Sequence, residues 1–333
     1  MSSARAQSHQ SARLIVIPGF LNERDVLAQL LGTSRAPLEA LGIEDPTASL
    51  DERAWLHAAQ DASQPHVEVE VFSWASQSLM KLLLEVLSPL ISLKLDLSQL
   101  RTFDQRVITA LFKAKGVWDE AVRQSDAALS DLLDRISALP HDEPVWILGH
   151  SLGGRIALHV AQRLALTSTS TGGASHMFAD PHGLSVSSTE RRAPTYISAW
   201  APAISRGELS WDSLSAIPHP PEVLFSRADY VLKLLFPLGQ ASIRRPQLLE
   251  VLKLLGPLFD EQRRAVGLIG PPPLARDTET PAALNSYTMV PSLDLSSEGM
   301  THSGYLHALP DLVRRSAYLN VIARDSEITD SER

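Results

Sequence analysis

The sequence contains no cysteine among its 333 residues. Without cysteine the chain can form no disulfide bond, offers no thiolate nucleophile and can build no zinc site with thiolate ligands. Several classes of enzyme that depend on cysteine are therefore excluded.

The sequence also lacks an excess of positive charge. Its formal net charge is -8 and its isoelectric point is near 5.8. Binding to nucleic acid requires clustered Lys and Arg side chains that displace counterions from phosphates. We therefore expect no nucleic acid partner.

Long uninterrupted hydrophobic runs are absent as well. The longest apolar region, Leu79 to Leu97, is broken by charged residues and by Pro89, so it cannot supply the roughly 20 apolar residues of a membrane-spanning helix. Near the N-terminus, the apolar stretch Leu14 to Ile17 is too short for the core of a signal peptide. These features predict a cytoplasmic protein, with peripheral contact to a membrane as the alternative.

What the sequence does have is ordinary globular composition, with 44% hydrophobic and 20% charged residues. We expect one large domain over residues 13–325, between a flexible N-terminus at 1–12 and a tail at 326–333. Helical segments are expected to be inserted into this domain around residues 79–115 and 230–270.

Short β-branched runs alternate along the chain with helical patterns. Strands are predicted at residues 14–17, 67–71, 145–148, 195–199, 223–226 and 286–290, and helices at 119–139, 155–166 and about 306–323. The alternating Val and polar residues at 67–71 suit a strand nearer a sheet edge. The alternation predicts an α/β fold with a doubly wound, mainly parallel sheet flanked by helices.

Three stretches interrupt this alternation. Residues 167–189 are rich in Ser, Thr and Gly, which predicts a surface insertion. Residues 79–97 and 230–259 are rich in leucine, and they fit either an apolar lid over a pocket or plain core packing. The stretch Gly270 to Pro273 is typical of a stiff connector.

A G-x-S-x-G motif lies between a predicted strand and a predicted helix, as Gly149, His150, Ser151, Leu152 and Gly153. In this context the motif forms a strained turn that raises the serine hydroxyl above the sheet. Residues without a Cβ atom are needed at both glycine positions, because strand and helix approach closely there. We therefore predict Ser151 as a nucleophile.

A serine hydroxyl needs a histidine base, which in this kind of fold follows the acid in the chain and lies after the last strand. Of the eleven histidines, only His302 and His307 lie there. His302 occupies a small polar loop, whereas His307 falls in the first turn of the terminal helix and is expected to face solvent. We predict His302 as the base, with His307 as the alternative.

The acid that orients the imidazole is expected after the strand at 223–226. Asp229 lies there and is our candidate, although Asp is also a favoured N-cap residue and Asp229 could merely cap the helix that begins at Tyr230. Asp212 and Glu208, after the preceding strand, are the fallback acids.

Two backbone N–H groups are candidates for binding an oxyanion. That of Leu152 lies at a helix N-terminus directly after the nucleophile. That of Phe20 lies after the first strand, where Pro18 and Gly19 stand in place of the His-Gly pair of many lipases.

With these residues placed, the chain resembles lipase-like α/β-hydrolases, and most closely the hydrolase domain of the transmembrane-and-coiled-coil-domain family, long a domain of unknown function. The likeness spans nearly the whole chain. It rests on the segments 17–21, 72–74, 149–154, 226–232 and 294–305. The resemblance implies an α/β-hydrolase fold, the triad Ser151, Asp229 and His302, and a lipid or ester substrate that is not assigned.

The sequence thus predicts a carboxylic ester hydrolase that works through an acyl-enzyme intermediate and needs no cofactor or metal. Its partner would be a small-molecule or lipid ester, with peripheral membrane contact through the leucine-rich helices as an option. Two alternatives stay open: a catalytically silent binding or scaffold protein with the same fold, and an acyltransferase or peptidase that uses the same triad.

Overall fold

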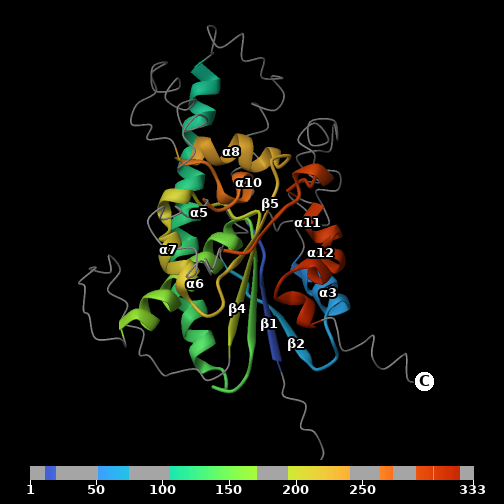
Figure 1. The fold of residues 1–333 in the computed structure, drawn as a ribbon. Helices are drawn as coiled ribbons and strands as arrows, with labels where there is room; N and C mark the ends of the chain where they lie inside the picture. Colours follow the sequence, from blue (N-terminus) through green and yellow to red (C-terminus); the bar gives the residue numbers. More distant parts are fainter. Residues whose placement is uncertain are drawn as a thin grey trace, which may run out of the picture.

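A computed structural model describes residues 12–19, 52–74, 105–170, 194–240, 263–272, 290–302 and 304–322. These residues form an α/β structure around one six-stranded sheet whose neighbouring strands are all parallel (Figure 1). The strand order is β2-β1-β3-β4-β5-β6. The strands are β1 (Ala12–Ile17), β2 (Val67–Val71), β3 (Val145–His150), β4 (Thr195–Trp200), β5 (Glu222–Phe225) and β6 (Ser292–Asp294).

Helices cover both faces of the sheet (Figure 1). On one face lie α3 (Glu52–Ala62), α11 (Gly304–His307) and α12 (Leu309–Arg315), and on the other lie α5 (Gln105–Ala138) and α6 (Leu152–Ser170). Beside α6 lies α7 (Trp211–Ala216), while α8 (Tyr230–Gln240) and α10 (Val266–Ile269) lie beyond the carboxyl ends of the strands. Three 3-10 turns complete the described elements: η2 (Arg206–Glu208), η6 (Ser296–Glu298) and η7 (Leu319–Ile322).

Two neighbouring interior strands, β1 and β3, explain why the sheet is covered on both sides. Residues Leu14 to Ile17 of β1 and Val145 to Leu148 of β3 are almost all β-branched or leucine, and their side chains are buried. A strand buried on both faces needs such a continuous apolar run, because neither face meets water. Helices must therefore pack on each side, and they bring the chain back for the next parallel strand.

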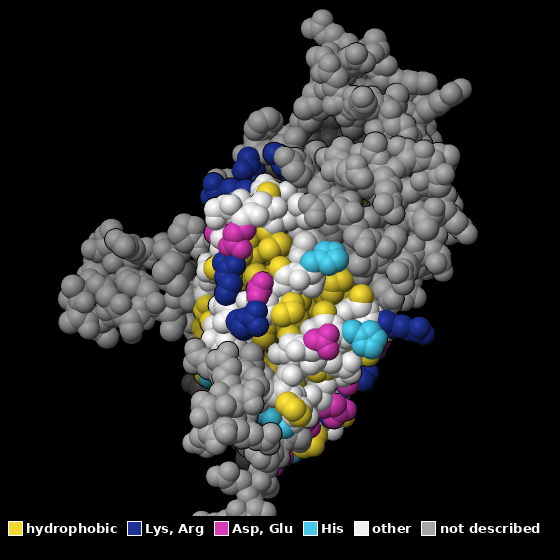
Figure 2. All heavy atoms as spheres, turned by 90° about the vertical axis from the view of Figure 1, so that its right-hand side faces the viewer, with side chains coloured by type: hydrophobic (Ala, Val, Ile, Leu, Met, Phe, Trp, Pro, Cys, Tyr) yellow, Lys and Arg dark blue, Asp and Glu magenta, His cyan; other side chains and the backbone are white. Residues whose placement is uncertain are grey.

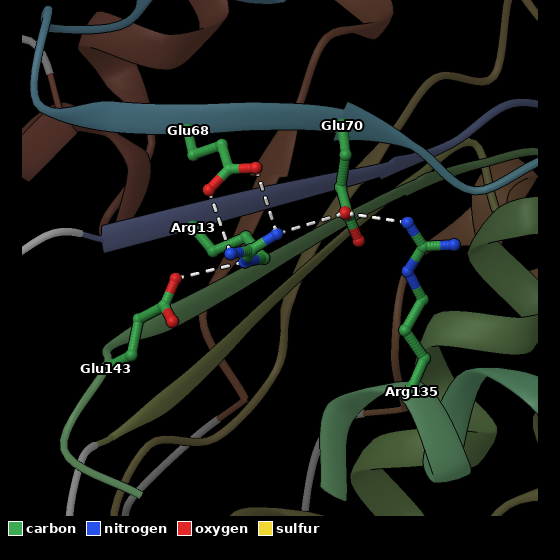
Figure 3. A network of polar contacts seen from close by, with 5 residues as sticks. All are labelled: Arg13, Glu68, Glu70, Arg135 and Glu143. Atoms are coloured by element: carbon green, nitrogen blue, oxygen red, sulfur yellow. Dashed lines mark hydrogen bonds and ion pairs between the residues drawn. The ribbon is translucent and has the colours of Figure 1, made fainter. Parts of the chain in front are cut away.

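At the amino end of the sheet, Arg13 on β1 joins three carboxylates from neighbouring segments (Figure 3). It lies 2.8 Å from Glu68 and 3.2 Å from Glu70, both on β2, and 3.0 Å from Glu143, which precedes β3. Arg135, near the end of α5, contacts Glu70 at 2.8 Å. This network ties the edge strand β2 to the centre of the sheet.

The prediction that residues 67–71 form a strand near an edge is confirmed, since β2 is the outermost strand beside β1. The predicted helix at 119–139 is too short at its start, because α5 begins at Gln105. Asp119 and Glu120 resemble the acids of a first helical turn. In the structure they lie inside the helix and pair with Lys115 and Arg123, one helical turn away.

The last strand that the structure describes lies after the predicted one. Residues 286–289 lie outside the described part of the chain, Val290 is not in a strand, and the pairing with β5 is made by Ser292 to Asp294. The β-branched and aromatic residues at 286–290 favour a strand by their composition. β6 has only three residues with mostly exposed side chains, so its composition gives no comparable signal.

The terminal helix predicted at about 306–323 is also different in the structure. It is divided into α11, α12 and η7. Pro310 stands at the start of α12, and α12 is followed by its C-cap Ser316, whose hydroxyl accepts hydrogen bonds from the N–H groups of Tyr318 and Leu319. Proline at a helix start and a side chain that binds the backbone both favour interruption.

The predicted insertions lie only partly within the described residues. Residues 167–170 continue α6 instead of starting a surface insertion, while 171–189 lie outside the described residues. The leucine-rich stretch 79–97 also lies outside them, and of 230–259 only α8 is described. Of the predicted connector, Gly270 and Pro272 bound the described portion.

The face that carries α3, α11 and α12 shows acidic and basic side chains close to one another (Figure 2). Exposed pairs on this side include Arg315 with Glu298 and Arg314 with Asp311. Exposed pairs of this kind contribute about 0–1 kcal/mol each, so they affect the stability of the fold little. Among the helices that the structure describes, none has the length and apolar character needed to cross a bilayer.

Candidate active site

The turn between β3 and α6 is built on two glycines that have no room for a side chain. A Cβ atom at Gly149 would lie 2.2 Å from the carbonyl oxygen of Gly153, and one at Gly153 would lie 2.1 Å from the carbonyl oxygen of Ile17. Real side chains do not approach backbone atoms so closely. The glycines of the motif are therefore required where α6 crosses the ends of β1 and β3.

Ser151 occupies the apex of this turn with a φ of 57°, in the left-handed region that non-glycine residues rarely adopt. Such a conformation costs about 1–3 kcal/mol and persists only where the surroundings enforce it. The N–H of Ser151 donates to Trp200 O at 2.9 Å, and its carbonyl oxygen accepts from Ala203 N at 2.9 Å. The end of β4 thus holds the strained residue on both sides.

The imidazole of His302 and the carboxylate of Asp229 are joined by a hydrogen bond. His302 Nδ1 lies 2.8 Å from Asp229 Oδ2, and the two side chains are 3% and 0% exposed. Because a carboxylate only accepts, Nδ1 carries the proton and the other ring nitrogen, Nε2, is left to accept one. The structure brings these two residues together although 73 positions separate them.

Asp229 uses its second oxygen to cap α8. Its Oδ1 accepts the N–H of Leu232 at 3.0 Å, which is an N-cap hydrogen bond. The sequence left open whether Asp229 caps a helix or orients a histidine, and the structure shows one carboxylate in both contacts. The cap fixes the rotamer of the side chain, so Oδ2 has a fixed position relative to His302.

The alternative candidates are placed elsewhere. His307 is exposed, as expected, in α11. Asp212 is exposed in the first turn of α7. Glu208 pairs with Arg155 and accepts the N–H and hydroxyl of Ser205. Its contacts are those of a capping and bridging carboxylate.

One of the two predicted oxyanion donors lies in the described structure. Leu152 is the first residue of α6, where backbone N–H groups have no partner within the helix. Phe20 lies outside the described residues. Its neighbour Gly19 is described, and a Cβ atom there would lie 2.6 Å from Ser151 Cβ. The chain after β1 therefore passes directly against Ser151, and only glycine allows this approach.

Two buried residues beside this group were not weighed at the sequence level. His150 lies 4.7 Å from His302 between ring centroids and contacts the main chain of the same residue. Tyr305 lies 5.6 Å from His150 between centroids, and its buried hydroxyl has no hydrogen-bond partner. Burial and the negative charges of Asp229 and Asp294 raise the pKa of Tyr305 well above its ordinary value, so it stays protonated.

A short segment around α10 connects the backbone next to Ser151 with the loop that carries Asp229. Gly267 donates its N–H to Pro202 O at 3.0 Å and accepts the N–H of Ser226 at 3.0 Å. Pro202 follows the end of β4 that holds Ser151, and Ser226 begins the loop that carries Asp229. One peptide segment thus links the supports of the serine and of the carboxylate, and nothing in the sequence around Gly267 indicated this role.

The arrangement places a serine hydroxyl at a strained turn and an imidazole paired with a carboxylate, groups that can take part in nucleophilic and acid–base chemistry. No group of three or more His, Asp or Glu side chains among the described residues is arranged to hold a metal ion. Searches with family models, among curated proteins and among solved structures found no match to this chain.

Proposed function

We propose that this protein is a serine hydrolase of the α/β-hydrolase fold that cleaves a carboxylic ester through Ser151, His302 and Asp229. The observation that carries the proposal is the buried hydrogen bond between His302 Nδ1 and Asp229 Oδ2, at the same end of the sheet as Ser151 with its left-handed backbone. The chain order of serine, acid and histidine, which follow the parallel strands β3, β5 and β6, supports it.

The proposed reaction begins with attack of Ser151 Oγ on the acyl carbonyl. His302 Nε2 accepts the serine proton, and the Asp229 carboxylate stabilises the imidazolium that forms. The carbonyl oxygen becomes an oxyanion, to which the N–H of Leu152 and, by its position in the sequence, that of Phe20 would donate.

The second half of the reaction releases both products. His302 returns the proton to the leaving alcohol as the ester bond breaks, which leaves an acyl group on Ser151. Water then attacks the acyl-enzyme, and His302 accepts a proton from the water and passes it to Ser151 Oγ as the acid leaves.

Labelling with a fluorophosphonate probe tests the nucleophile directly, because such probes react with an activated serine. We expect one modified serine, Ser151. Ser151→Ala should abolish labelling and lower hydrolysis of p-nitrophenyl esters on the order of 10⁴-fold or more with little change in stability. Ser137→Ala is the matched control, because Ser137 lies near the end of α5 and binds only a helix carbonyl, Leu133 O.

Folded wild-type protein that resists the probe and cleaves no ester would overturn the proposal in favour of a silent binding protein. A series of p-nitrophenyl esters of increasing chain length, run with and without phospholipid vesicles, would define the substrate. A preference for short soluble esters without vesicle binding would exclude hydrolysis at a lipid interface.

A further inference from the structure

His150, the residue before Ser151, is buried at the junction of three elements. Its ring lies 5.1 Å from that of Trp55 in α3 and 5.6 Å from that of Tyr305 in α11, between centroids. The third neighbour is His302, at 4.7 Å. Only 5% of His150 is exposed, so this polar side chain is kept within an aromatic environment directly beside the base.

The polar contact of His150 is made with the main chain of the base. His150 Nε2 lies 3.0 Å from the carbonyl oxygen of His302, 152 positions away in the sequence. A carbonyl oxygen only accepts hydrogen bonds, so Nε2 carries the proton and donates it. The tautomer of His150 is therefore fixed by the segment that it contacts.

His150 is well suited to remain uncharged in this position. Burial lowers its pKa well below the ordinary value, and the charge that His302 takes on when protonated lowers it further. The hydrogen bond to the His302 carbonyl opposes these effects only in part. A neutral ring beside His302 adds no repulsion when the base carries a proton.

The segment that carries His302 is anchored to β5 and to the start of the loop that follows β5, before the histidine is reached. Its strand, β6, has three residues and pairs with β5. After β6, Leu295 N donates to Phe225 O at 2.8 Å and Ser296 Oγ accepts the N–H of Arg227 at 2.9 Å. The main-chain hydrogen bonds nearer to His302 are local turns, such as Gly299 N to Ser296 O and Gly304 N to Thr301 O. Two bonds connect His302 itself to distant elements: the side-chain bond to Asp229 and the main-chain bond from His150.

We propose that His150 is a positioning residue that holds the main chain of His302 through its Nε2–H and so keeps the imidazole of the proposed base in a fixed place relative to Ser151. The bond to Asp229 fixes the rotation of the imidazole, and the bond from His150 fixes the backbone from which it extends. Both are needed, because a rigidly oriented ring on a displaced backbone would still miss the serine.

Two variants of nearly equal shape separate this role from plain packing. Gln places a donor near the position of His Nε2, whereas Met has a similar length but no N–H. This inference rests on the proposed hydrolase function, so ester hydrolysis is one readout. The second readout needs no turnover: the low-field proton resonance of His302 Nδ1–H, which reports the hydrogen bond to Asp229.

We expect His150→Met to lower kcat by about ten- to a hundred-fold with little change in KM, because the misplaced base affects the chemical step. The low-field resonance should broaden or disappear. His150→Gln should retain kcat to within about threefold and keep the resonance, because the donor is restored. If His150→Met does not fold, His150→Phe replaces it, since Phe keeps the ring between Trp55 and Tyr305 and has no donor.

Equal impairment of the Gln and donor-less variants, or no impairment of either, would overturn the positioning role. Wild-type protein that neither reacts with the fluorophosphonate probe nor cleaves esters would overturn the hydrolase proposal alone. The comparison of resonances would then still decide whether His150 holds His302.

Discussion

Two carboxylates at opposite ends of β5 are both buried, yet their partners differ. Glu222 begins the strand and is 3% exposed, and Asp229 follows its far end and is fully buried. Glu222 accepts hydrogen bonds from the hydroxyls of Ser198 and Ser316 and from Ala317 N at 2.7 Å. Asp229 accepts from Leu232 N and from an imidazole.

The difference lies in what the partners can do. The donors to Glu222 do not titrate near neutral pH, and they join β4, β5 and the segment after α12 into a fixed unit. Asp229 has one donor that fixes its rotamer and one that can gain a proton. Burial alone therefore does not identify a reactive carboxylate. In the proposed mechanism the distinguishing feature is the imidazole partner, because an imidazole can transfer a proton to or from a third group.

The largest effect should come from Asp229→Asn. Asn can still cap α8, so the free energy of unfolding should change little. Its neutral amide cannot stabilise the imidazolium and favours the wrong tautomer of His302, so kcat should fall by about 10³- to 10⁴-fold. Ester kinetics together with urea unfolding check this. If the variant kept most of its activity, Asp229 would not be the acid that supports His302.

The opposite carboxylate should show the reverse pattern. Glu222→Gln places an amide against three donors, which leaves at least one buried donor unpaired and lowers the free energy of unfolding by about 1–3 kcal/mol. The kcat of the folded fraction should not change. Urea unfolding measures the loss. Glu298→Gln is the control, because Glu298 is exposed and its pairing with Arg315 should contribute less than about 1 kcal/mol.

The smallest effect is expected for Asp212→Asn, which tests the fallback acid. Asp212 is exposed in the first turn of α7, so its neutralisation should change stability by no more than about 0.5 kcal/mol. Hydrolysis should stay at the wild-type level in the same ester assay. A loss of activity greater than that of Asp229→Asn would show that the acid had been assigned to the wrong strand end.

The parts of the molecule that the sequence predicted well are those where local chemistry leaves little choice. The turn at Ser151 needs glycine on both sides, and a strand buried on both faces needs an apolar run such as Leu14 to Ile17. Asp229 and His302 could be selected because their order in the chain and their place after strands restrict the candidates. All of these constraints are visible within a few residues.

The features that were missed depend on contacts between distant segments. β6 has little intrinsic strand character and is defined by its pairing with β5. α5 begins at Gln105, and Asp119 and Glu120 are paired inside the helix, which the pattern of acids does not reveal. His150 was visible in the motif, but its contact with the His302 carbonyl spans 152 positions. Contacts between distant segments determine these features, and such contacts cannot be predicted from any one segment alone.

The short length of β6 has a consequence for when this site exists. Ser151 follows the central strand β3, whereas His302 follows β6, a three-residue strand at the edge of the sheet. Among the described strands, β6 is the last to be synthesised. If the proposed mechanism holds, a chain that is still being synthesised, or whose edge strand has detached, would hold Ser151 without its base. Reactivity of the serine would therefore report on completion of the sheet, and unfinished molecules would stay chemically silent.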